Sequence, residues 1–101
     1  MSDPDFEYHP DAMDETGEAY RWYADRDPEA ADRFKQEIQH ARSSIVRNPL
    51  MWPPYLHGTR RVILEDFPFS LVYSVEDTRI VGVAVAHHRR RPGYWKDRLA
   101  D

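Results

Sequence analysis

The sequence contains no cysteine, and it has few of the other residues on which common chemical sites are built. Without thiols there is no disulfide, no thiolate nucleophile and no cysteine-containing metal site, which fits a cytoplasmic protein. The four glycines are scattered, so they form no phosphate-binding loop, and no serine stands in a nucleophile elbow. The histidines lack metal-ligand spacing. We therefore expect no metal and no cofactor, and neither nucleotide-driven nor hydrolase chemistry.

Long apolar runs are also missing, because no stretch approaches the roughly 18 residues that a membrane span needs. The sequence begins MSDPDFEYHPDAMDE, which is acidic where a signal peptide is basic and then apolar. The chain has 101 residues, of which 41% are hydrophobic, and this suits one globular domain over residues 1–101. We expect no membrane partner and a cytoplasmic location.

The charge is distributed unevenly along the chain. Residues 1–56 carry 6 Lys and Arg against 12 Asp and Glu, whereas residues 57–101 carry 8 against 6. A partner with an acidic surface should therefore meet the C-terminal half of the protein.

Two helices are predicted in the N-terminal half. The first has Asp11 as its N-cap. Its inward face should contain Ala12, Thr16, Ala19, Tyr20 and Tyr23. The second begins at Asp27-Pro28, where the aspartate caps the helix and the proline takes the first helical position, and it ends at Asn48-Pro49. Its buried side should contain Ala31, Phe34, Ile38, Ala41 and Ile45.

Strands are predicted on either side of this helical pair. A short edge strand with Phe6 and Tyr8 on one side is closed by Pro10, and RRVILE, FSLVYSV and RIVGVAVAHH form an antiparallel meander. In the last strand, Val81, Val83 and Val85 should lie opposite Ile80, Ala84 and Ala86. The loop before the meander should turn its apolar side chains inward: Leu50, Met51, Trp52, Tyr55 and Leu56. The expected fold class is α+β, with an antiparallel two-helix hairpin packed on a small, mostly antiparallel twisted sheet.

The stretch AHHRRRPGYW, residues 86–95, is the candidate functional segment. Because strand side chains alternate, His87 and His88 should point to opposite faces, and so should Arg60 and Arg61. One face should then combine basic and aromatic side chains from the two segments. The candidate residues for binding a target or partner are Arg60, Arg61, His87, Arg89, Arg90, Arg91 and Trp95.

A purely structural interpretation of the same segment is also open. A histidine at a strand end is commonly a hydrogen-bonded structural residue, and a run of arginines is commonly a solvated surface. Trp95, which follows Pro92-Gly93, has the character of a latch that covers an open end of the core.

Five segments follow one another in a fixed order: Trp22-Tyr23, DPEAADRF, NPLMWP, RRVILEDFPFSLVYSVED and RIVGVAVAHHRRRPGYW. Together they resemble the RelE/ParE superfamily of bacterial toxins, which are often called plasmid-stabilisation proteins, over about residues 5–98. It implies the toxin component of a type II toxin–antitoxin module. It also implies a cognate antitoxin that wraps the toxin with a partly disordered, acidic and hydrophobic segment, along the helical hairpin or across the sheet.

Two activities occur in that superfamily, and the resemblance implies different residue roles for each. RelE-type toxins cleave messenger RNA on the ribosome without a metal, and on this alternative His88, Tyr94, Arg61 and Arg90 would be catalytic. However, Ser70 stands where those nucleases usually carry an arginine aimed at the phosphate. ParE-type toxins bind and inhibit DNA gyrase, and the spacing of His87 and Arg90 after the last strand is closer to this type.

The overall charge favours the second activity. A protein that docks inside the ribosome benefits from many contacts between basic residues and phosphates, whereas this chain has a sequence pI near 5.7. We therefore expect a growth-inhibiting, ParE-like toxin that is not an enzyme and that binds gyrase and an antitoxin. A messenger-RNA endoribonuclease and a non-toxic relative that only binds its partner are the alternatives.

Overall fold

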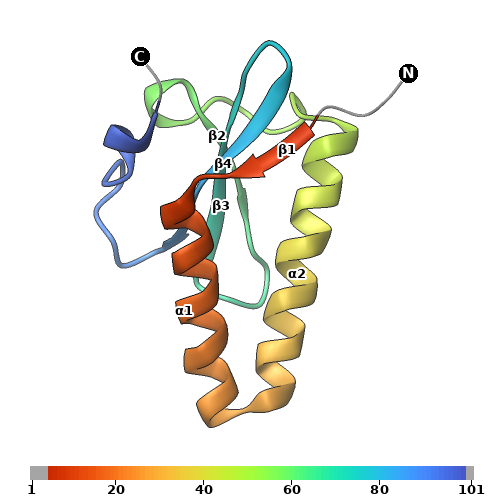
Figure 1. Ribbon diagram of the computed structural model, residues 1–101, viewed down its shortest axis with the longest axis vertical. Coiled ribbons are helices and arrows are strands. Elements are labelled where there is room, and N and C mark those ends of the chain that lie inside the picture. Colours follow the sequence, from red (N-terminus) through yellow and green to blue (C-terminus); the bar gives the residue numbers. More distant parts are fainter. Residues whose placement is uncertain (1–4, 100–101) are drawn as a thin grey trace.

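In the computed structural model, which describes residues 5–99, two helices cover one face of a four-stranded sheet (Figure 1). The predicted domain covers residues 1–101, and its residues 1–4 and 100–101 lie outside the described residues. The elements are β1 (Asp5–Tyr8), α1 (Pro10–Arg26), α2 (Pro28–Arg47), η1 (Leu56–Gly58), β2 (Arg60–Ile63), β3 (Phe69–Val75), β4 (Arg79–His87) and η2 (Lys96–Arg98). The antiparallel hairpin of α1 and α2 and the α+β class are confirmed.

Helix α2 follows its sequence signals closely. The carboxylate of Asp27 accepts hydrogen bonds from the backbone N–H groups of Glu29 and Ala30, at 3.1 and 3.3 Å, and Pro28 opens the helix. All five side chains predicted to face inward are buried, namely Ala31, Phe34, Ile38, Ala41 and Ile45. No helix within residues 5–99 combines the length and the apolar character needed to cross a membrane.

Helix α1 begins earlier than predicted. Its N-cap is His9, whose Nδ1 accepts a hydrogen bond from the backbone N–H of Asp11 at 3.1 Å, and Pro10 is the first helical residue. The prediction that Asp11 caps the helix is therefore wrong, because the fixed φ of Pro10 already suits the first helical position. Asp11 instead lies in the first turn, where its charge favours the helix dipole.

The sheet has the strand order β1-β4-β3-β2. Strands β2, β3 and β4 form the predicted antiparallel meander, and β1 is an edge strand that pairs with β4 in parallel. Because β1 ends at Tyr8, no strand from residues 5–99 lies on that side of the second half of β4. Helix α1 packs along this half of β4, which brings the helix close to the end of the strand (Figure 1).

A β-bulge in β4 changes which side chains face the helices. The pairing of β3 with β4 shifts between Val72 and Tyr73, so that Val83 is an extra residue without a partner in the register. Val85 consequently joins Ile80 in the core under the helices, whereas Val83 packs on the opposite face. The prediction that Val83 and Val85 share a face is wrong, because regular alternation does not continue across a bulge.

The loop between α2 and β2 is only partly folded inward. Trp52 and Tyr55 are half-buried, but Leu50, Met51 and Leu56 are 63%, 66% and 40% exposed, so the prediction was wrong for these three. A turn after α2, closed by the hydrogen bond from the Met51 N–H to the Asn48 carbonyl, directs the first two outward. Trp52 then packs edge-on against Tyr73.

Candidate functional site

The paired arginines of β2 point to opposite faces of the sheet, as predicted. Arg61 lies opposite Val72, and its guanidinium carbon is 4.0 Å from the centre of the Tyr55 ring. Arg60 lies opposite Tyr73, on the helix side, and donates a hydrogen bond to the carbonyl of Trp52. Arg60 is therefore directed away from the face that contains Arg61.

The two histidines at the end of β4 are separated in the same way. His87 lies beside Phe69 on the helix side, with 5.0 Å between the ring centroids, and its Nδ1 accepts a hydrogen bond from the Arg89 N–H at 3.0 Å. Burial, followed by the charges of Arg89 and His88, lowers the pKa of His87 below its ordinary value. His88 lies on the other face, where its Nε2 is 3.0 Å from the hydroxyl of buried Ser70.

The residues after β4 form a tail that crosses the face opposite the helices. Trp95 is 1% exposed and packs with Val72, Val83 and Ala84. The latch interpretation is thus confirmed for Trp95. Its side chain is sealed inside and cannot contact a partner, so the prediction that Trp95 is a binding residue is wrong.

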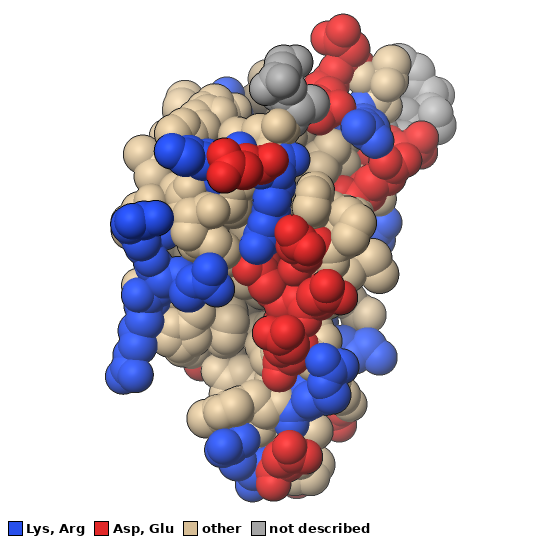
Figure 2. All heavy atoms as spheres, turned by 60° about the vertical axis from the view of Figure 1, so that its left-hand side comes forward, with Lys and Arg blue, Asp and Glu red and all other residues tan. Residues whose placement is uncertain are grey.

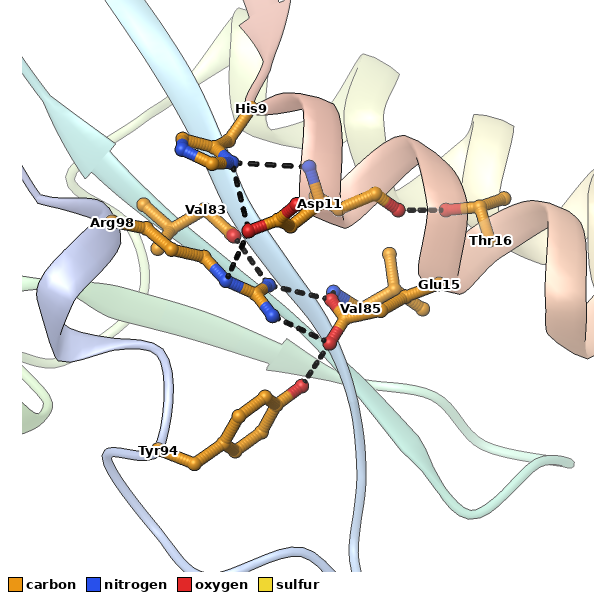
Figure 3. A network of polar contacts seen from close by, with 9 residues as sticks. His9, Asp11, Glu15, Thr16, Val83, Val85, Tyr94 and Arg98 are labelled. Carbon is orange, nitrogen blue, oxygen red and sulfur yellow. Dashed lines mark hydrogen bonds and ion pairs between the residues drawn. The ribbon is translucent and has the colours of Figure 1, made fainter.

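Glu15 on α1 fastens this tail to the helix (Figure 3). Its carboxylate forms two hydrogen bonds with the guanidinium of Arg98, at 2.8 and 3.1 Å, and accepts another from the hydroxyl of Tyr94. It also accepts a hydrogen bond from the backbone N–H of Val85 in β4 at 3.0 Å. Glu15, Tyr94 and Arg98 are called the tail clamp below.

The tail clamp holds the hydroxyl of Tyr94 in its protonated form. Burial, together with the hydrogen bond to Glu15, raises the pKa of Tyr94 well above its ordinary value of 10.0. The guanidinium carbon of Arg90 lies 3.9 Å from the centre of the same ring. Tyr94 therefore presents a stacking surface and not a free hydroxyl. A general base needs a pKa close to the working pH, so Tyr94 is poorly suited to that role.

The two segments predicted to form the site meet around a small concavity of about 120 Å³. We call the side chains of Arg61, His88, Arg90 and Arg91 around it the basic face. Its lining is completed by Tyr55, Ser70, Val72, Ala86, His87, Pro92, Tyr94 and Trp95. Arg89 lies apart, in a separate hollow that it shares with Trp22, Tyr23 and Phe69. The structure thus brings together Arg61, Arg90 and Arg91, but not Arg60 or Arg89.

The arginines of the basic face differ from the structural arginines in their partners. Arg79 and Arg98 form ion pairs with carboxylates. Among residues 5–99, no ion pair includes Arg61, Arg90 or Arg91. Figure 2 shows basic side chains gathered on the tail side of the molecule, next to a band of acidic side chains over α1. Within the same described residues, no cluster of three or more His, Asp or Glu side chains is arranged to hold a metal ion.

The fold and this face define a class: a small α+β protein in which arginine and histidine side chains surround a concavity near the end of the last strand. The family model of the ParE toxin of the type II toxin–antitoxin system parDE matches residues 6–92, and the chain belongs to this family. A chain of the chromosomal ParDE toxin–antitoxin system from P. aeruginosa has a similar fold, with a TM-score of 0.73 and 20% identity. The match covers 83% of this chain and 95% of that one.

These comparisons confirm the predicted RelE/ParE superfamily and the toxin component of a type II toxin–antitoxin module, and such a module includes an antitoxin. Nothing in them supports the messenger-RNA endoribonuclease alternative. Among curated proteins there is no significant match to this sequence.

Proposed function

We propose that this chain is a growth-inhibiting toxin that binds and inhibits DNA gyrase through its basic face, and that it is not an enzyme. It acts in the cytoplasm, and with its antitoxin it stabilises the replicon that encodes the pair. The observation that carries this proposal is the set of guanidinium groups of Arg61, Arg90 and Arg91, which line one concavity and have no ion-pair partner among residues 5–99. Charged groups held in this way provide electrostatic complementarity to an acidic protein surface.

The nuclease alternative has weaker support from the same residues. The hydroxyl of Tyr94 donates a hydrogen bond to Glu15, and Ser70 is buried. By the resemblance to RelE-type nucleases, an arginine aimed at the phosphate would be expected at the position of Ser70. The acidic band over α1 lies beside the basic face and would repel the backbone of a long nucleic acid (Figure 2). A discrete acidic patch on a protein fits this local pattern of charge better.

The antitoxin has a separate surface available to it. A groove of about 510 Å³ lies between α1 and α2, and its apolar lining includes Tyr8, Tyr20 and Ile38. The basic residues Arg21 and Lys35 also line it. An amphipathic segment with acidic residues along its edges would match this groove in both apolar surface and charge, and we assign the groove to the antitoxin.

Induced expression tests this function directly. We expect arrested growth with an SOS response when the chain is expressed alone, and normal growth when the neighbouring antitoxin gene is expressed with it. Unharmed growth without the antitoxin would instead identify a non-toxic relative that only binds its partner.

A translating extract separates the two toxic activities. Gyrase inhibition predicts that messenger RNA stays intact in the extract when the protein is added. Cleaved messages that become intact with His88→Ala or Tyr94→Phe would instead support the RelE-type activity.

A further inference from the structure

Two guanidinium groups of the basic face are held in place before any partner arrives. Arg61 is stacked on Tyr55 and Arg90 is stacked on Tyr94, at 4.0 and 3.9 Å from the respective ring centres. Stacking on an aromatic ring occupies the flat surface of a guanidinium and leaves its edge N–H groups free to donate. Because fewer rotamers must be lost on binding, each such group binds an anion at a lower entropic cost.

The supporting rings are themselves anchored. The hydroxyl of Tyr94 donates a hydrogen bond to Glu15 in the tail clamp (Figure 3). The backbone N–H of Tyr55 donates to the carbonyl of Thr59 at 2.7 Å, and its ring packs near buried Trp95. The rings that support the two stacked arginines are thus fixed by contacts with the rest of the fold.

Both groups line the same concavity, together with polar side chains that can complete an anion site. The hydroxyl of Ser70 and Nε2 of His88 are 3.0 Å apart at this concavity, and Ser70 is 2% exposed. No carboxylate from residues 5–99 forms an ion pair with Arg61 or Arg90. The protein therefore supplies the donors of an anion site without supplying the anion.

The surroundings of the concavity favour one kind of anion. The concavity has a volume of about 120 Å³ and accommodates an oxyanion group beside its arginines. A polyanion would also approach the acidic band over α1, whereas one carboxylate on a protein partner would not. A planar carboxylate matches the fork of N–H donors on a guanidinium.

We propose that this concavity is an oxyanion socket that receives one aspartate or glutamate carboxylate of the protein bound by the basic face. The inference rests on the proposed function in that the partner is a protein. It assigns a chemical group to the contact: Arg61 and Arg90 donate to the carboxylate oxygens from two sides, and Ser70 and His88 form the polar floor.

The socket can be tested on the free protein by NMR, with sodium acetate as the probe at constant ionic strength in chloride. We expect the side-chain Nε–H signals of Arg61 and Arg90 and the ring signals of His88 to shift and saturate with acetate. Arg61→Gln removes one charged donor and should weaken acetate binding about tenfold or more. Arg33→Gln, which removes a charge from the exposed side of α2, should leave the affinity unchanged.

Two results would overturn the inference. One is a response that stays linear in acetate, or that is equal for acetate and chloride. The other is tighter, saturable binding of a dinucleotide phosphodiester, which would indicate a nucleic-acid site. Arg90→Gln provides a second variant should Arg61→Gln fail to give the dispersed spectrum of a folded protein. Because gyrase is absent from this experiment, failure of the socket and failure of gyrase inhibition are observed separately.

Discussion

Glu15 is the single residue on which most of the site geometry depends. It joins α1 to β4 and to the tail through one carboxylate, and it thereby fixes the ring on which Arg90 is stacked. The side chains of Glu15 and Arg98 are both 15% exposed, so their ion pair is only weakly screened by water. A surface ion pair of the usual kind contributes little to stability, but this partly buried and bidentate one should contribute more.

Replacing Glu15 with glutamine should therefore destabilise the protein. We expect Glu15→Gln to lower the free energy of unfolding by about 1.5–3 kcal/mol, because charged hydrogen bonds are lost and the partly buried Arg98 keeps only its longer ion pair with Asp11, at 3.6 Å. Urea denaturation measures this change. The control is Glu18→Gln in the same helix, an exposed position where we expect a change within about 0.5 kcal/mol. Equal stabilities of the two variants would contradict the assigned role of Glu15.

The titration of His87 gives a second check on the end of β4. Its pKa is lowered below 6.5 by burial and then by the charges of Arg89 and His88, so the folded state favours the neutral ring. The stabilisation associated with this neutral ring is complete above pH 6.5 and is lost as the pH falls through the lower, folded-state pKa. In an NMR titration, Arg89→Gln should raise the pKa of His87, whereas Arg33→Gln should not. A His87 pKa at or above 6.5 would show that the ring is not placed as described.

Among the elements, β1 depends on a glycine in its partner strand. An added Cβ at Gly82 in β4 would lie 2.8 Å from Cδ1 of Tyr8 and 3.0 Å from Cε1 of Phe6. Those two rings pack edge to face with 5.0 Å between their centroids. The glycine thus allows the two aromatic side chains of a four-residue edge strand to close over β4.

Two substitutions of glycine by alanine should therefore change the stability of the protein in opposite directions. Gly82→Ala forces the rings apart and should cost about 1–3 kcal/mol of unfolding free energy, with faster hydrogen exchange in β1. Gly17→Ala in α1 meets only the flexible end of Arg21, at 3.2 Å, and should stabilise the helix by up to about 1 kcal/mol. Both changes remove similar freedom from the unfolded chain, so their difference reports on the folded state. A stabilising Gly82→Ala would refute the close packing of β1.

The elements also show how far the sequence alone is informative. Local signals determine α2, where Asp27-Pro28 and a regular apolar spacing predict both the start and the buried side. They also predict the three strands of the meander. The start of α1 was misplaced because His9 is an uncommon cap. The face predicted for Val85 was wrong because a β-bulge has no strong signature in a single sequence.

For the whole molecule, the face that contains the candidate site could be predicted only in part. Alternation along strands separates Arg60 from Arg61 and His87 from His88, and the resemblance to known toxins places the tail nearby. The contact of Glu15 with Tyr94 and Arg98 joins residues about 80 positions apart, and nothing in the local pattern around Glu15 points to it. Such a contact follows from the packing of the tail on α1, which only three-dimensional structure reveals.

The division of charge along the chain has a counterpart in space. The acidic N-terminal half provides the band over α1, and the basic C-terminal half provides the basic face beside it (Figure 2). A surface that carries positive and negative charges side by side can orient a partner with the complementary charge pattern. For this reason we assign a protein target to the basic face.

The most direct test of this assignment is DNA supercoiling by purified gyrase in the presence of the toxin. The wild-type protein should inhibit supercoiling, and so should the variant Arg33→Gln/Arg47→Gln, which loses the same charge from α2. The variant Arg61→Gln/Arg90→Gln should require at least about tenfold more protein for equal inhibition, because each lost charged contact weakens binding. Supercoiling that is unaffected by saturating wild-type protein, or inhibited equally by both double variants, would contradict the proposed role of the basic face.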